Sequence, residues 1–131
     1  MVLMLTRRKI LTLFEEGVTV KVHLKGAPEG TKGTWREDGD ARVDLYPQNM
    51  ESREDFDLTL LHEFEHAVAD NMPRGYNVQA TYRKKEQGSG GYVQTEDCDI
   101  AEAHAVDLYR NDPEIVRFIK TTFNVRNPLK D

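Results

Sequence analysis

The spacing of apolar side chains changes along the chain and divides its first half into four elements. Residues 6–16 carry apolar positions that suit one face of a helix, and a glycine follows as a stop signal. Residues 18–24 then alternate between apolar and polar side chains, which predicts a half-buried strand. Two further strands are predicted within residues 33–38 and 41–49, around a turn at 38–40 that is rich in Gly and Asp.

The second half of the chain has helical periodicity. Ser52 opens a helix of about five turns in capping style, and Asn71 with Pro73 ends it. One face of this helix is apolar and is expected to dock on the sheet, through Leu60, Leu61, Phe64, Ala67 and Val68. A polar loop is predicted at 76–94, and two more helices follow at 95–111 and 113–123.

These elements predict an α+β fold, with an N-terminal helix, a small three-stranded sheet and later helices, in a single domain over residues 1–131. Pro47 ends the last strand, and its missing amide hydrogen favours an edge position in the sheet. His23 falls on the polar side of the first strand, so we expect it to face solvent rather than bind a metal.

Composition narrows the class of protein. The formal net charge of −5 argues against non-specific nucleic-acid binding, which depends on Lys and Arg that neutralise phosphates. No apolar run approaches the roughly 20 residues that span a bilayer, and the first residues lack the pattern of a secretory signal. The one cysteine excludes an internal disulfide. We expect a cytoplasmic protein, and the sequence does not define its oligomeric state.

The stretch TLLHEFEHAVAD, residues 59–70, contains two histidines four residues apart with a glutamate after the first. On an α-helix, His62 and His66 lie one turn apart and present their imidazoles to the same point. Glu63 is offset by about 100° and lies beside that point, where a general base belongs. A catalytic zinc takes three protein ligands and keeps one position for water, whose proton a carboxylate can accept. The motif therefore predicts two zinc ligands and a catalytic base.

The third zinc ligand is expected from the later helix, because no third histidine extends the motif. Glu102 is the favoured candidate, since its small neighbours would let that helix approach closely. His104, Asp99 and Cys98 remain alternatives, but His104 is about 200° from Glu102 around the helix, so both cannot face one metal. A thiolate at Cys98 could instead take the place of the water and hold a latent form.

With these residues, the chain resembles the gluzincin metallopeptidases, and among them the minigluzincins and the catalytic domain of the ImmA/IrrE proteins. The resemblance rests on the order of elements, on TLLHEFEHA in the motif helix, and on the ExxA pattern that begins at Glu102. It implies a zincin-like fold in which Zn²⁺ is bound by His62, His66 and Glu102 and Glu63 acts as the base. The strand segment 42–46 would align a peptide substrate as the edge strand of the sheet.

Two positions depart from that family pattern. Glu65 lies between the motif histidines, where uncharged residues are usual, and Val106 occupies a position that is often acidic. The expected function is zinc-dependent hydrolysis of peptide bonds in protein or peptide substrates. The alternative is a zincin-fold binding or regulatory module with little or no catalysis, because a fold does not guarantee turnover. Candidates for stabilising the oxyanion are Tyr76, Tyr82, Tyr92 and Tyr109.

Overall fold

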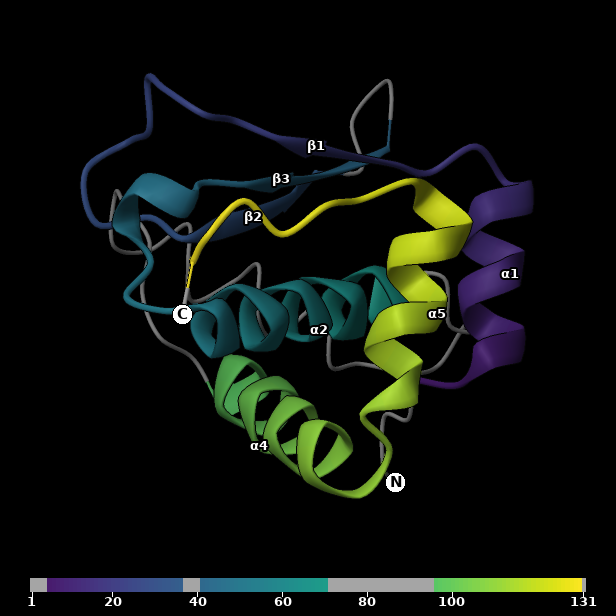
Figure 1. Ribbon diagram of the computed structural model, residues 1–131. Helices are drawn as coiled ribbons and strands as arrows, with labels where there is room; N and C mark the ends of the chain where they lie inside the picture. Colours follow the sequence, from purple (N-terminus) through teal and green to yellow (C-terminus); the bar gives the residue numbers. More distant parts are fainter. Residues whose placement is uncertain (1–4, 37–40, 71–95, 131) are drawn as a thin grey trace.

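The computed structural model describes residues 5–36, 41–70 and 96–130 (Figure 1). Its elements are α1 (Arg7–Glu15), β1 (Thr19–Val22), β2 (Gly33–Arg36), β3 (Arg42–Leu45), the short 3-10 helix η1 (Pro47–Asn49), α2 (Arg53–Asp70), α4 (Glu96–Asn111) and α5 (Glu114–Phe123). The predicted α+β class is confirmed, and each described element falls within or close to its predicted range. The turn at 38–40 and the loop at 76–94 lie outside the described residues.

Local signals explain where the first helix begins and ends. The hydroxyl of Thr6 accepts a hydrogen bond from the backbone N–H of Lys9 at 3.2 Å, which satisfies one of the unpaired amides of the first turn of α1. Gly17 follows the helix with a φ of 93°, a conformation that glycine adopts without a steric penalty. The chain can therefore turn directly from α1 into β1.

The three strands form a mixed sheet in the order β1-β3-β2. β3 pairs parallel with β1, with Val43 opposite Val20, and antiparallel with β2, with Asp44 opposite Thr34. The prediction that segment 42–46 is an edge strand is therefore wrong, because β3 is the central strand. Pro47 follows β3 in η1, where its missing amide hydrogen removes no bond from the sheet.

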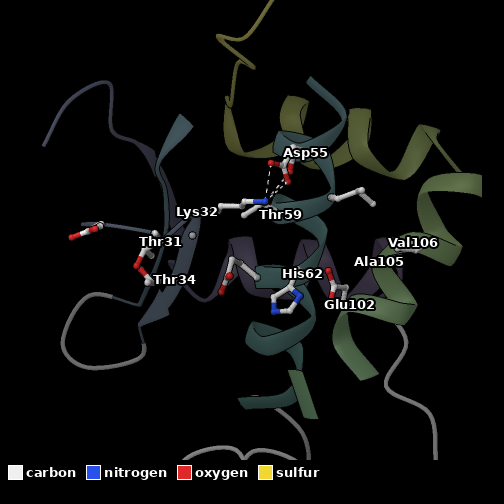
Figure 2. Close-up of a pocket in the computed structure, with 14 residues that line it drawn as sticks. Thr31, Lys32, Thr34, Asp55, Thr59, His62, Glu102, Ala105 and Val106 are labelled. Carbon is white, nitrogen blue, oxygen red and sulfur yellow. Dashed lines mark hydrogen bonds and ion pairs between the residues drawn. The ribbon is translucent and has the colours of Figure 1, made fainter. Parts of the chain in front are cut away.

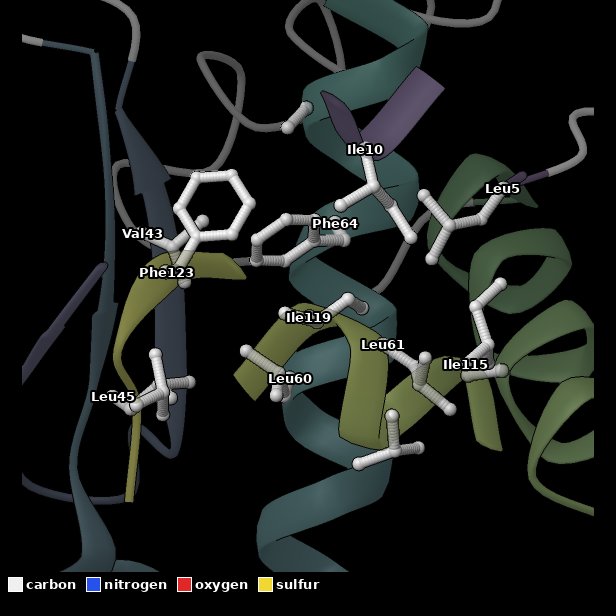
Figure 3. Packing of buried hydrophobic residues seen from close by; sticks show 14 of the residues in the cluster. Leu5, Ile10, Val43, Leu45, Leu60, Leu61, Phe64, Ile115, Ile119 and Phe123 are labelled. Carbon is white, nitrogen blue, oxygen red and sulfur yellow. The ribbon is translucent and has the colours of Figure 1, made fainter. Parts of the chain in front are cut away.

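α2 lies in the middle of the molecule. Figure 1 shows the sheet on one side of α2 and α4 on the other, with α1 and α5 together near one end. The predicted apolar stripe of α2 is confirmed as core, and Figure 3 shows Phe64 packed near Phe123 of α5 and Ile10 of α1. Because neighbours cover α2 on several sides, part of its polar face is buried as well, as Thr59, Glu63, Glu65 and His66 show.

The C-terminal segment returns from α5 to the start of α2 and is tied there by hydrogen bonds. Arg53 donates to the backbone carbonyls of Asn127 and Leu129, and the side chain of Asn127 donates in return to the carbonyl of Arg53. Asn127 is only 8% exposed, so these bonds satisfy a buried amide. Among the described helices, none has the length and apolar character needed to cross a membrane.

Candidate metal and catalytic site

The two motif histidines meet as their spacing predicts. The Nε2 atoms of His62 and His66 are 3.0 Å apart, and their ring centroids are 4.7 Å apart. Two imidazole nitrogens that bind one tetrahedral zinc at about 2.0–2.1 Å each are about 3.3 Å from one another. His66 is 8% exposed and His62 is half-buried, so the protein holds both rings in place. The pair therefore has nearly the separation that two ligands of one zinc require.

His62 lines a pocket of about 470 Å³ bounded by α2, α4 and the segment that enters β2. Glu63 and Glu102 line the same pocket, and Figure 2 shows the carboxylate of Glu102 directed from α4 toward the imidazole of His62. Glu63 is 8% exposed, whereas Glu102 is exposed. The volume lies in the range of small-molecule and peptide side-chain sites. One end of the pocket thus combines an imidazole, a buried carboxyl group and a second carboxyl group.

Strand β2 forms the wall of the pocket opposite α4. Gly33 of β2 lies so close to α2 that a Cβ atom added to it would be 2.8 Å from Cγ2 of Thr59 and 3.2 Å from Cγ of Glu63. Only a residue without a side chain allows this approach, because carbon atoms in contact are normally about 3.5–4.0 Å apart. Gly33 therefore brings the backbone of the strand next to the predicted catalytic base.

The structure separates the candidates for the third ligand. Glu102 faces the pocket, whereas Nδ1 of His104 lies 3.6 Å from Oε1 of Glu65. The side chains of Cys98 and Asp99 lie outside those that the structure describes. Among the described residues, no three or more His, Cys, Asp or Glu side chains are grouped so that they could hold a metal ion. The described residues therefore supply two converging imidazole nitrogens, of which that of His62 lies on the pocket wall together with the carboxyl group of Glu102. The role of Glu102 as a ligand stays a prediction.

Glu65 is fully buried in the middle of α2. Burial raises the pKa of its carboxyl group to about 8, although the nearby backbone of Leu5 and the charge of Lys9 act in the opposite direction. Neither carboxyl oxygen has a hydrogen-bond partner among the described residues. The sequence showed that Glu65 is a charged residue between the motif histidines. It gave no signal that this side chain would be buried near His104 of α4.

The other end of the pocket carries an ion pair that sequence analysis missed. Nζ of Lys32 lies 3.0 Å from Oδ2 of Asp55, with the two side chains 44% and 18% exposed. Asp55 precedes His62 by seven residues, which is about 10 Å along a helix axis. The distance from this ion pair to the imidazoles is therefore about the length of three residues of an extended peptide. Its two members are far apart in sequence, and no local pattern links them.

Two other predicted positions can be compared with the structure. His23 does not simply face solvent as predicted, because its Nε2 lies 2.7 Å from Oδ1 of the buried Asp44 and its ring stacks on Tyr46. It lies outside the pocket and is not a candidate ligand there. Tyr109 packs against the core rather than lining the pocket. The other three tyrosine candidates, Tyr76, Tyr82 and Tyr92, fall outside the described residues.

Comparison with known proteins adds no relative: no protein-family model, no curated protein and no solved structure matches the chain.

Proposed function

We propose that this protein is a zinc-dependent metallopeptidase of the gluzincin type. The observation that carries the proposal is the 3.0 Å separation of the Nε2 atoms of His62 and His66, together with the pocket that His62, Glu63 and Glu102 line. His62, His66 and Glu102 would hold the metal. A bound zinc would supply Lewis acidity, which lowers the pKa of a water molecule so that it can lose a proton and become a nucleophile near neutral pH.

Glu63 acts as the general base in this proposal. Its place beside the histidine pair and on the pocket wall lets its carboxylate accept a proton from the attacking water and later donate it to the leaving amine. Its 8% exposure excludes most bulk solvent, which strengthens the interaction of the carboxylate with groups that carry charge in the transition state. The backbone of Gly33 lies close to Glu63, since a Cβ atom added to Gly33 would be 3.2 Å from Cγ of Glu63.

The peptide substrate would bind along β2 by strand addition. The backbone N–H of Tyr46 donates to the carbonyl of Lys32 at 2.8 Å, so the peptide groups of Lys32 and, by alternation, of Thr34 face β3. The peptide groups of Gly33 between them point to the opposite edge of β2. In the described part of the chain, no strand pairs with that edge. An extended substrate could therefore bond to it while its side chains enter the pocket.

Metal analysis and cleavage assays test the proposal together. The purified protein should contain about one zinc, and Glu63→Gln should keep this zinc while losing about 100-fold or more of its activity on unfolded protein substrates. Glu54→Gln, on the exposed first turn of the same helix, is the matched control and should cleave normally. Full activity in Glu63→Gln would refute the assigned base. Loss of zinc in a variant with alanine at both His62 and His66 would support the assigned ligands.

The second candidate function is a zincin-fold binding module with little catalysis. It is favoured by Glu65, a fully buried carboxyl group between the motif histidines, where uncharged residues are usual in the family that the chain resembles. In that case the protein should bind unfolded proteins at β2 and leave them intact, with or without added zinc and chelator. Unchanged metal content and melting temperature after removal of both histidines would instead indicate a structural protein without a metal.

A further inference from the structure

A buried carboxyl group and an imidazole meet where α4 packs on α2. Oε1 of the fully buried Glu65 lies 3.6 Å from Nδ1 of His104, whose side chain is 19% exposed. Nδ1 itself is buried, and neither it nor a carboxyl oxygen of Glu65 makes a hydrogen bond of good geometry among the described residues, although the backbone of Leu5 lies near the carboxyl group. Buried polar groups without hydrogen bonds cost free energy, so their presence in a folded protein needs a reason.

The apolar part of this helix contact differs along α4: Leu108 and Tyr109 pack against the core near the C-terminal end of the helix, whereas the turn that carries Glu102 makes its contact through alanines. Ala101 and Ala105 are each 1% exposed and form the closely packed side of α4, while Ala103 is exposed. Ala101 and Ala105 each bury one methyl group, and alanine occupies positions 101, 103 and 105. Around Glu102, alanine contacts permit close packing, but they discriminate poorly between small rotations of this turn about the helix axis.

The position of Glu102 depends on this rotation. Glu102 and His104 are two residues apart and therefore about 200° apart around the helix. When His104 contacts Glu65, Glu102 points to the other side of α4, where Figure 2 shows its carboxylate directed toward His62. We propose that Glu65 and His104 are a positioning pair, which sets the rotation of α4 on α2 and so presents Glu102 to the two histidines. This inference rests on the proposed zinc site.

A polar pair discriminates between rotations because the wrong ones are costly. If α4 rotated, Glu65 would stay buried in α2 and lose the one imidazole that faces it. Single buried polar contacts are known to fix register between helices in this way. His104 of α4 thereby provides a polar neighbour for Glu65, the charged residue between the motif histidines.

Zinc affinity and stability can be measured separately to test the pair. His104→Leu should lower zinc affinity about 10- to 100-fold, the range for residues that orient metal ligands. His104→Asn, which keeps a polar group near the position of Nδ1, should bind zinc like the wild type. The double variant Glu65→Met with His104→Leu should unfold at a urea concentration at least as high as the wild type in the metal-free form, yet still bind zinc weakly. Asp107→Asn, exposed on α4, is the matched control.

A double-mutant cycle tests whether the effect passes through Glu102. In a Glu102→Gln background, His104→Leu should cause no further loss of zinc affinity, because the residue that it positions is already gone. A full additional loss, or wild-type affinity in the stable apolar double variant, would overturn the positioning role. Zinc binding that depends on Glu102 but not on His104 overturns this inference alone. A wild-type protein that binds no zinc defeats the proposed function, and this inference with it.

Discussion

Replacing Gly33 by alanine is a direct test of the contact between the sheet and the proposed catalytic helix. The new methyl group would lie 2.8 Å from Cγ2 of Thr59, 3.2 Å from Cγ of Glu63 and 3.3 Å from the carbonyl oxygen of Asp44. Thr59 cannot easily rotate away, because its hydroxyl donates to the carbonyl of Asp55 at 2.7 Å. The strand or the helix therefore has to shift.

The expected magnitude follows from two opposing terms. Inserting a methyl group into a packed contact typically costs about 1–3 kcal/mol. An alanine in a conformation that it can adopt stabilises by about 0.4–1 kcal/mol, because it restricts the unfolded chain more than glycine does. Gly33 lacks the positive φ that would strain an alanine, so this second term applies. We expect a net loss of about 1–2 kcal/mol in the free energy of unfolding.

Urea unfolding of four proteins measures this contact: the wild type, Gly33→Ala, Thr59→Ser and the double variant. Thr59→Ser removes the methyl group that clashes and keeps the hydroxyl. By itself it should cost about 1 kcal/mol, and in the double variant it should recover most of the loss caused by the alanine. Cleavage should fall in Gly33→Ala even where the protein stays folded, because Glu63 is displaced. A Gly33→Ala variant as stable as the wild type, or strictly additive effects, would refute the close approach.

Three further predictions concern charge and packing. Glu65 has a pKa raised to about 8 by burial, so the metal-free folded state keeps a proton that the unfolded chain loses. The free energy of unfolding of the metal-free protein in urea should therefore fall as the pH rises from about 4.5 to about 8. Glu65→Gln should reduce this dependence on pH. Arg53→Ala should cost about 1–3 kcal/mol through lost bonds to the C-terminal carbonyls, against about zero for the exposed Arg117→Ala. Phe64→Ala should cost about 3–5 kcal/mol, and Phe14→Ala, half exposed, clearly less.

Features that depend on neighbours within one turn or one strand could be predicted from the sequence. The four-residue spacing brought the imidazoles of His62 and His66 together, and the hydroxyl of Thr6 caps the helix that its position predicted. The alternation over residues 18–24 predicted β1 for the same reason. In each case the residues that decide the geometry lie close together along the chain.

The order of the strands could not be predicted in the same way. Segment 42–46 has the length and Pro47 that suit an edge strand, yet β3 pairs on both sides and β2 forms the wall of the pocket. Pairing joins Val20 to Val43 across more than twenty residues, and it depends on which arrangement covers the apolar face of α2. The approach of Gly33 to Glu63 follows from that arrangement and has no signal within either segment.

The sequence by itself determined the class of fold, the order of its elements and a helix with two imidazoles on one face, because periodicity and spacing act locally. Tertiary structure alone decided that β2 is the pocket wall, that Lys32 pairs with Asp55 and that His104 faces Glu65 rather than the pocket. These contacts join residues from separate elements, and they form only when the burial of the shared core fixes how the sheet, α2 and α4 pack together.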